Sequence, residues 1–143
     1  MTRPLMLSCG SAALALALLG TGGALAASRN QQTFASGAHD KEMLSLAPGT
    51  RMEQRCNARA MGEVGRGHKD LHPDELVAYA FADTVTSAGA VKAPGAAVRS
   101  GGKWYRLSYS CRTSPDGMTV LSFDYTLGAV VPKSDWSAHY LVP

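Results

Sequence analysis

The sequence predicts an α+β fold in which one main helix packs on a four-stranded, mostly antiparallel sheet, closed by one disulfide. Three observations lead to this prediction. Apolar residues recur every four positions in the middle of the chain, apolar and polar residues alternate from Leu76 onward, and turn-forming residues separate the alternating runs. A length of 143 residues suits one domain of this kind.

The amino-terminal residues 1–27 are typical of a cleavable export signal. Arg3 supplies the positive charge, residues 12–19 form a short apolar stretch, and Ala24-Leu25-Ala26 offers the small side chains that a signal peptidase needs. A transmembrane anchor is the weaker interpretation, because this apolar stretch is much shorter than the roughly 20 residues that span a bilayer. We exclude a lipoprotein signal, since Cys9 precedes the apolar stretch instead of following it.

After the signal, residues 28–39 are polar and small, and we expect a flexible tether there. The single domain is then expected over residues 40–143. The formal net charge of the whole chain is only +3, and its Lys and Arg residues are scattered. This charge is too small and too dispersed for a nucleic-acid binder, so we expect no nucleic-acid partner.

The main helix is expected from Pro48 to Val64. Pro48 suits the first helical turn, whereas Gly65 and Gly67 end the helix. Its apolar positions follow a strict four-residue spacing, which places them along one face. These positions are Met52, Cys56, Ala60 and Val64. Asp40 is a plausible cap for a shorter helical turn before this helix.

Four strands are predicted within 75–82, 91–99, 104–111 and 120–127. In the first strand, Val77, Tyr79 and Phe81 are expected to share one face. Pro94 and Gly95 predict an edge position or a bulge in the second strand. Turns are predicted at 100–102 and at 114–117, where Ser-Gly-Gly and Ser-Pro-Asp-Gly occur.

The last two strands have clear inward faces, formed by the odd-numbered residues 105–111 and 121–127. Both apolar sets must lie on the same side of the hairpin, because a slip of one residue would send one set into solvent. Together with the turn length, this favours Leu107 opposite Phe123 and Tyr109 opposite Leu121. On the outer side, Arg106 would then face Asp124 as a cross-strand ion pair.

Two cysteines, Cys56 and Cys111, remain once the signal is removed. In an oxidising compartment such a pair most often forms a disulfide. Two buried free thiols or a redox pair are the alternatives, although a redox pair usually has a Cys-x-x-Cys spacing. Since both cysteines lie on the faces that point to the core, the disulfide would join the helix to the sheet.

Several stretches of the chain resemble the bacterial domain-of-unknown-function family numbered 930. The first is 46–56, which reads LAPGTRMEQRC. The others are VAYAFA at 77–82, WYRLSYSC at 104–111 and SFDYTLG at 122–128, with Pro132 and Trp136 behind them. The resemblance implies an exported protein of alphaproteobacterial type, and it brings no activity, substrate or active site with it.

His68 and His72 are the one close pair of histidines in the sequence. A spacing of four could place both on one helical face, and Asp70, Asp74 or Glu75 could complete a metal site. However, a glycine precedes His68 and a proline follows His72, so the pair is predicted to lie in a loop that does not fix its geometry. We therefore expect a solvated loop, with no metal and no cofactor.

No catalytic residues are predicted. The disulfide would consume both cysteines of the exported chain, and no serine lies in a Gly-x-Ser-x-Gly elbow. Paired carboxylates for glycoside chemistry remain open, because their separation is a tertiary property.

The outer face of the last hairpin is the predicted partner-binding face. Trp104, Arg106 and Asp124, together with Ser108 and Thr126, would form a mixed patch around one large aromatic. The competing interpretation, which we favour for this residue, is that Trp104 covers the sheet or packs under the carboxyl-terminal segment.

The function favoured at this point is a non-catalytic binding or scaffolding module of the periplasm, with an envelope protein or a cell-wall component as its partner. A small envelope enzyme acting on cell-wall glycan or peptide is the first alternative. A structural envelope component without a specific ligand is the second.

Overall fold

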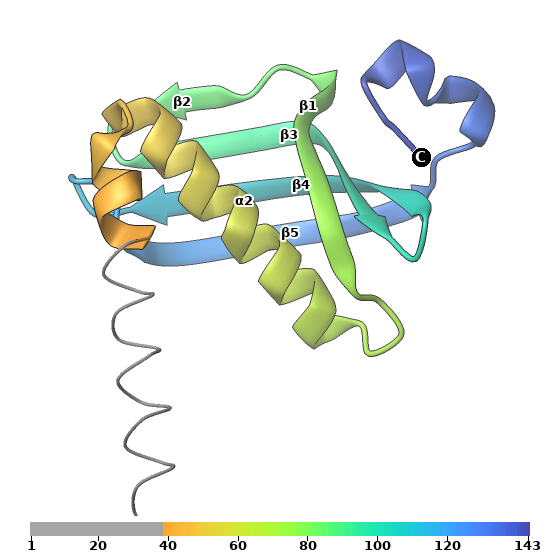
Figure 1. Ribbon diagram of the computed structural model, residues 1–143, viewed down its shortest axis with the longest axis horizontal. Coiled ribbons are helices and arrows are strands. Elements are labelled where there is room, and N and C mark those ends of the chain that lie inside the picture. Colours follow the sequence, from red (N-terminus) through yellow and green to blue (C-terminus); the bar gives the residue numbers. More distant parts are fainter. Residues whose placement is uncertain (1–38) are drawn as a thin grey trace, which may run out of the picture. The chain divides into compact units, whose positions relative to one another are not determined.

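The computed structural model describes residues 39–143 (Figure 1). The predicted signal peptide at 1–27, and all of the predicted tether except residue 39, lie outside the described residues. Within the described part, no helix combines the length and apolar character needed to cross a membrane.

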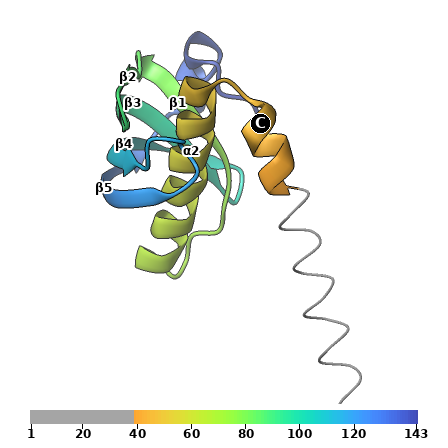
Figure 2. The same cartoon turned by 90° about the vertical axis from the view of Figure 1, so that its left-hand side faces the viewer.

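The fold is α+β, as predicted. A helical turn at 39–45 precedes the main helix, and five strands and two short 3-10 turns follow. These elements are α2 (Pro48–Gly67), β1 (Pro73–Ala82), β2 (Val85–Ser87), β3 (Ala90–Ser100), β4 (Lys103–Thr113), β5 (Val120–Val130), η1 (Lys133–Asp135) and η2 (Ser137–His139). Figure 1 shows α2 crossing one face of the sheet, and the view in Figure 2 separates these two layers.

The sheet is antiparallel with strand order β1-β3-β4-β5, and the short β2 also pairs with β3. The predicted sheet had four strands, and β2 is the addition. Its three residues, Val85–Ser87, are all exposed and too few to produce a recognisable alternation.

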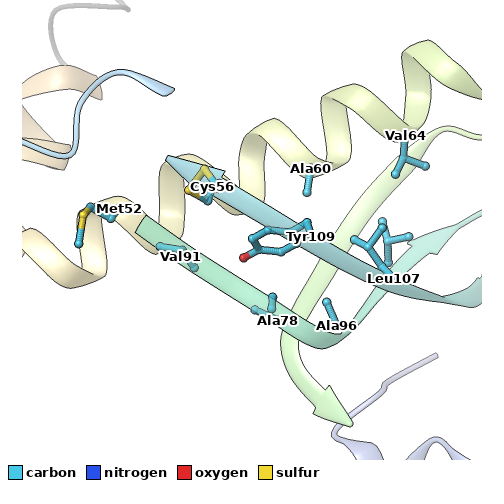
Figure 3. Close-up of a cluster of buried hydrophobic side chains, with 12 residues drawn as sticks. Met52, Cys56, Ala60, Val64, Ala78, Val91, Ala96, Leu107 and Tyr109 are labelled. Atoms are coloured by element: carbon cyan, nitrogen blue, oxygen red, sulfur yellow. A yellow bond between two sulfur atoms is a disulfide. The ribbon is translucent and has the colours of Figure 1, made fainter. Parts of the chain in front are cut away.

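Helix α2 follows its apolar stripe. The four predicted positions are buried against the sheet, and Pro48 occupies the first turn. The helix continues through Gly65 and ends at Gly67, three residues beyond the predicted end, and the His68 N–H donates to the Val64 carbonyl at 2.9 Å. The stripe meets the inner face of the sheet in one apolar cluster, which Figure 3 shows from the side of α2.

Strand β3 is central, so the prediction of an edge position was wrong and that of a bulge was correct. Its register against β4 shifts between Ala93 and Ala96, around Pro94 and Gly95. Proline cannot donate to a ladder, and a bulge accommodates this loss. A Cβ on Gly95 would overlap the backbone of Ala82, so glycine allows β1 to approach closely.

The side chains of strand β1 are divided between two apolar clusters. Its register against β3 shifts between Val77 and Ala82. Val77 pairs with Ala97 and Ala82 pairs with Gly95, so residues 78–81 of β1 lie opposite the single residue Ala96 of β3. As a result Ala78 faces the cluster beneath α2, and Ala80 packs in a second cluster elsewhere. Val77 and Phe81 pack against that second cluster, whereas Tyr79 is 55% exposed.

The β4–β5 register also differs from the prediction. Leu107 pairs with Leu127 and Tyr109 pairs with Tyr125, four residues away from the expected partners. The loop after β4 reaches Thr119, whose carbonyl accepts from the Ser114 N–H at 2.8 Å, so it is longer than a four-residue turn. Because four is an even number, the inward and outward faces of β4, and those of β5 from Phe123 onward, stay as predicted.

One residue of β5 is displaced by a bulge at its start. The register shifts between Arg112 and Thr113, which pair with Ser122 and Val120. Leu121 therefore turns outward and is 64% exposed, whereas Val120 packs against the apolar cluster between α2 and the sheet, called the inner cluster below.

The predicted disulfide between Cys56 and Cys111 is confirmed. It joins the middle of α2 to β4, with 5.9 Å between the two Cα atoms, and lies within the inner cluster (Figure 3). Two tyrosine hydroxyls add polar links between the same layers. The Tyr109 hydroxyl donates to the Asn57 side-chain oxygen at 2.6 Å, and the Tyr125 hydroxyl donates to the Glu63 carbonyl at 3.2 Å.

Hydrogen bonds from Arg51 hold the amino-terminal end of α2 to the neighbouring segments. Its Nε donates to the Met43 carbonyl at 2.9 Å, and its Nη2 donates to the carbonyls of Leu44 at 3.0 Å and Leu46 at 2.9 Å. Its Nη1 donates to the Asp116 carbonyl at 2.6 Å. One buried guanidinium thus connects the helical turn at 39–45, α2 and the β4–β5 loop.

Removing the disulfide is expected to destabilise the fold strongly. The bridge closes a sequence separation of 55 residues, and a loop of that length constrains the unfolded chain by about 4 kcal/mol. We expect the double substitution Cys56→Ala and Cys111→Ala to lower the free energy of unfolding by about that amount in urea titrations. Reducing the unsubstituted protein should give a similar loss. Unchanged unfolding midpoints after either treatment would contradict the role of the bridge.

Arg51→Met is expected to lower the free energy of unfolding by about 3 kcal/mol or more, because it keeps apolar volume but removes four hydrogen bonds to backbone carbonyls. Arg59→Met, on an exposed part of the same helix, is the matched control and should change stability by less than about 0.5 kcal/mol. Equal effects of the two substitutions in urea unfolding would show that the Arg51 hydrogen bonds contribute little.

Candidate functional site

The outer face of the sheet, opposite α2, divides into a covered part and an open part. The covered part is a second apolar cluster formed by the carboxyl-terminal segment with β1, β3 and β4. Its buried members are Ala80, Ala97, Trp104, Val131, Trp136 and Leu141.

Trp104 belongs to the covered part, so its predicted role as an exposed contact residue was wrong. Its side chain is fully buried at 0% exposure, and its Nε1–H donates to the Val142 carbonyl at 2.8 Å. The competing interpretation, in which the carboxyl-terminal segment packs on this tryptophan, was correct. The physical reason is that Val131, Trp136 and Leu141 return over the sheet after β5 and bury the indole.

Arg106 and Asp124 remain on the open part, but they do not form the predicted pair. Asp124 lies opposite Ser110, because the register differs by four residues from the predicted one. The guanidinium of Arg106 instead stacks over Phe81, with its central carbon 3.4 Å from the ring centroid. Gly128 leaves room for this arrangement, since a Cβ there would lie 2.8 Å from the Arg106 Cβ.

The open part is hollowed into a trough that crosses β3, β4 and β5. It consists of three adjoining hollows of about 330, 160 and 190 Å³, and the first shares lining residues with each of the other two. We call this surface the polar trough. Its polar lining residues are Lys92, Ser108, Ser110, Ser122, Asp124 and Thr126, with Arg106 at one end and Arg112 at the other.

The polar trough offers both donors and acceptors. The hydroxyls of Ser108, Ser110 and Thr126 can each donate and accept, and their small size leaves the floor of the trough open. Lys92 and the two terminal arginines outnumber the single carboxylate of Asp124. This arrangement is suited to hydrogen bonding with an elongated polar ligand that carries negative charge.

The sequence analysis found Arg106, Ser108, Asp124 and Thr126 for this face, but missed Lys92 and Arg112. Lys92 lies in β3, between the buried residues Val91 and Ala93. That alternation was a usable signal, although β3 was treated as a possible edge strand. Arg112 lies one residue beyond the stretch in which β4 was predicted.

The histidine pair does not form a cluster. His68 follows the last turn of α2, and His72 precedes β1 in the exposed link between the two elements. No group of three or more His, Cys, Asp or Glu side chains able to hold a metal ion occurs among residues 39–143. The ring of His68 instead approaches Tyr125 edge-on, with 6.3 Å between centroids.

Tyr109 is the ionisable group most strongly perturbed by burial. Removal of its phenol from water raises the pKa of Tyr109, and the nearby Glu53 carboxylate raises it further. The hydroxyl is held by Asn57 between the sheet and α2, on the side away from the polar trough. This group therefore supports the interior and is not available to the open face.

These features define a small α+β domain, closed by one disulfide, with a polar trough on the open part of its sheet. The chain belongs to the Domain of Unknown Function family DUF930, whose model matches residues 43–141. This match begins at Met43, whose carbonyl accepts a hydrogen bond from Arg51, and ends at Leu141 in the second cluster. No curated protein and no solved structure matches the chain.

Trp104→Ala is expected to lower the free energy of unfolding by about 3–5 kcal/mol, because it empties the centre of the second cluster. Trp104→Phe should cost less, since it keeps apolar contact and loses chiefly the hydrogen bond to Val142. Tyr79→Ala removes an exposed aromatic and serves as the control. Denaturant unfolding that gave equal small losses for Trp104→Ala and Tyr79→Ala would contradict the buried role of Trp104.

Proposed function

We propose that the protein is an exported, non-catalytic binding module of the cell envelope, and that the polar trough holds a cell-wall fragment. The observation that carries this proposal is the trough itself. It is continuous across three strands and is lined by hydroxyl and charged side chains of β3, β4 and β5.

The shape and charge of the trough support a polymeric, acidic ligand. Adjoining hollows in a row fit an extended chain better than a compact molecule. Lys92, Arg106 and Arg112 provide positive charge along its length, and Asp124 is the one carboxylate in the lining. Cell-wall glycan strands with peptide stems are extended, rich in hydroxyl and amide groups, and carry carboxylates, so they complement each of these properties.

Two observations support the exported location. Residues 1–27 have the three parts of a cleavable signal. The disulfide between Cys56 and Cys111 joins two buried cysteines, and such structural bridges are typical of oxidising compartments such as the periplasm.

The test is binding of muropeptides, released from cell-wall sacculi with a muramidase, to the purified protein. Calorimetry would give the affinity, and amide chemical shifts would locate the site. We expect shifts concentrated in the outward residues of β4 and β5. Lys92→Glu should weaken binding by about fivefold, as expected for losing one exposed ion pair and replacing it with repulsion.

Lys69→Glu is the matched control, since it makes the same charge reversal in the link after α2, away from the polar trough. Asp124→Lys provides a second check, because it should strengthen binding of an acidic fragment. Muropeptide binding that is equally weakened by Lys92→Glu and Lys69→Glu, or shifts confined to the helix side of the sheet, would refute the assignment of the site.

A further inference from the structure

Strand β5 (Val120–Val130) forms a free edge of the sheet. It is the last strand in the order β1-β3-β4-β5 and pairs with β4 alone among the described strands. Figure 1 shows it as the lower border of the sheet. Its 11 residues carry a single charge, at Asp124. Long edge strands with few charges are templates for pairing with another extended chain, and most proteins protect them.

A row of arginines lies beside the start of this edge. Arg55, Arg59 and Arg66 line a groove of about 420 Å³ together with the small residues Ala58 and Gly62. The opposite wall consists of Met118, Thr119 and Val120, which lead into β5. A helix with a positive stripe therefore borders the groove on one side, and the first residue of the edge strand borders it on the other.

The arginine row has more donors than the protein uses. Arg55 pairs with Asp40 at 2.7 Å, whereas Arg59 and Arg66 share the Glu63 carboxylate at 3.3 and 2.7 Å. The side chains of Arg59 and Arg66 are 40% and 59% exposed. Each guanidinium carries five N–H donors, so most donors of these two arginines face water or a ligand.

We propose that an acidic, extended segment of a partner protein adds to the sheet as a strand beside β5, with its carboxylates directed at Arg59 and Arg66. Main-chain hydrogen bonds to an edge strand supply affinity in such complexes, and alternate side chains supply specificity. Arginine pairs with carboxylates through two parallel hydrogen bonds, which would set the position of the added strand. This site differs from the polar trough and does not depend on it.

Two other occupants fit the observations less well. A phosphate group would use the arginines but would leave the edge of β5 without a partner. A second copy paired antiparallel through β5 would satisfy the edge, but the β5 strand of that copy would bring a single carboxylate, at Asp124, toward the arginines. An acidic strand satisfies the edge and the arginines together.

The test uses a fluorescent seven-residue peptide that alternates valine and glutamate, with anisotropy as the readout on the purified protein. Two comparison peptides separate charge from strand addition. One alternates valine and lysine, and the other is the valine–glutamate peptide with alternate amides N-methylated. We expect binding of the unmodified acidic peptide alone, weakening at high salt, with slower hydrogen exchange of β5 amides when it is bound.

Arg59→Gln with Arg66→Gln should weaken binding of the acidic peptide at least about threefold, as expected for two exposed ion pairs. The matched control, Lys69→Gln with Lys103→Gln, removes the same charge elsewhere and should leave the affinity unchanged. The comparison of peptides on the unsubstituted protein keeps the test decisive if the double arginine variant folds poorly.

Equal binding of the acidic peptide and its N-methylated form would overturn strand addition. Equal binding of the lysine peptide would overturn the role of the arginines. Binding of pyrophosphate or of phosphatidylglycerol vesicles at Arg59 and Arg66, without peptide binding, would assign the groove to a free phosphate or a lipid headgroup instead. A dimer in light scattering with exchange-protected β5 amides would assign the edge to a second copy.

Discussion

The disulfide between Cys56 and Cys111 is the constraint on which the rest of the structure depends. It joins α2 to β4, and both sulfurs lie in the apolar cluster between the helix and the sheet. A cross-link between α2 and an interior strand holds the helix against the inner face without depending on the edge strands. The Arg51 hydrogen bonds then anchor the amino-terminal end of α2 to the β4–β5 loop, and the Tyr125 hydroxyl bonds near its carboxyl-terminal end.

Because α2 covers the inner face, the outer face and the β5 edge are the surfaces of the sheet that α2 leaves open. The carboxyl-terminal segment takes part of the outer face by packing Val131, Trp136 and Leu141 over Trp104. The open part of the outer face is polar. Arg106, which stacks on Phe81, lies at the boundary between the covered and open parts. One face of the sheet thus has a covered apolar half that stabilises the fold and an open half lined by polar side chains.

The sequence stretches that resemble the family contain several residues whose role is to stabilise the fold. The first contains Arg51 and Cys56, which hold α2 in place, and the third contains Trp104 and Cys111, which lie in the two apolar clusters. Membership of DUF930 therefore indicates a shared fold. The polar trough and the arginine row lie mostly at outward positions between these residues, and their chemistry has to be argued from their own side chains.

The sequence by itself determined the elements whose signals are local. The four-residue spacing from Met52 to Val64 predicted α2 and its buried face, and the alternation from Tyr105 to Cys111 predicted β4 and the disulfide. Period and side-chain polarity determine which face is buried, so these predictions did not need the rest of the chain. Tertiary structure alone decided the β4–β5 register, the central place of β3 and the burial of Trp104. An even shift of register keeps every side chain on the same face, and a covering segment distant in sequence leaves no trace in local alternation, so neither can be read without the packed fold.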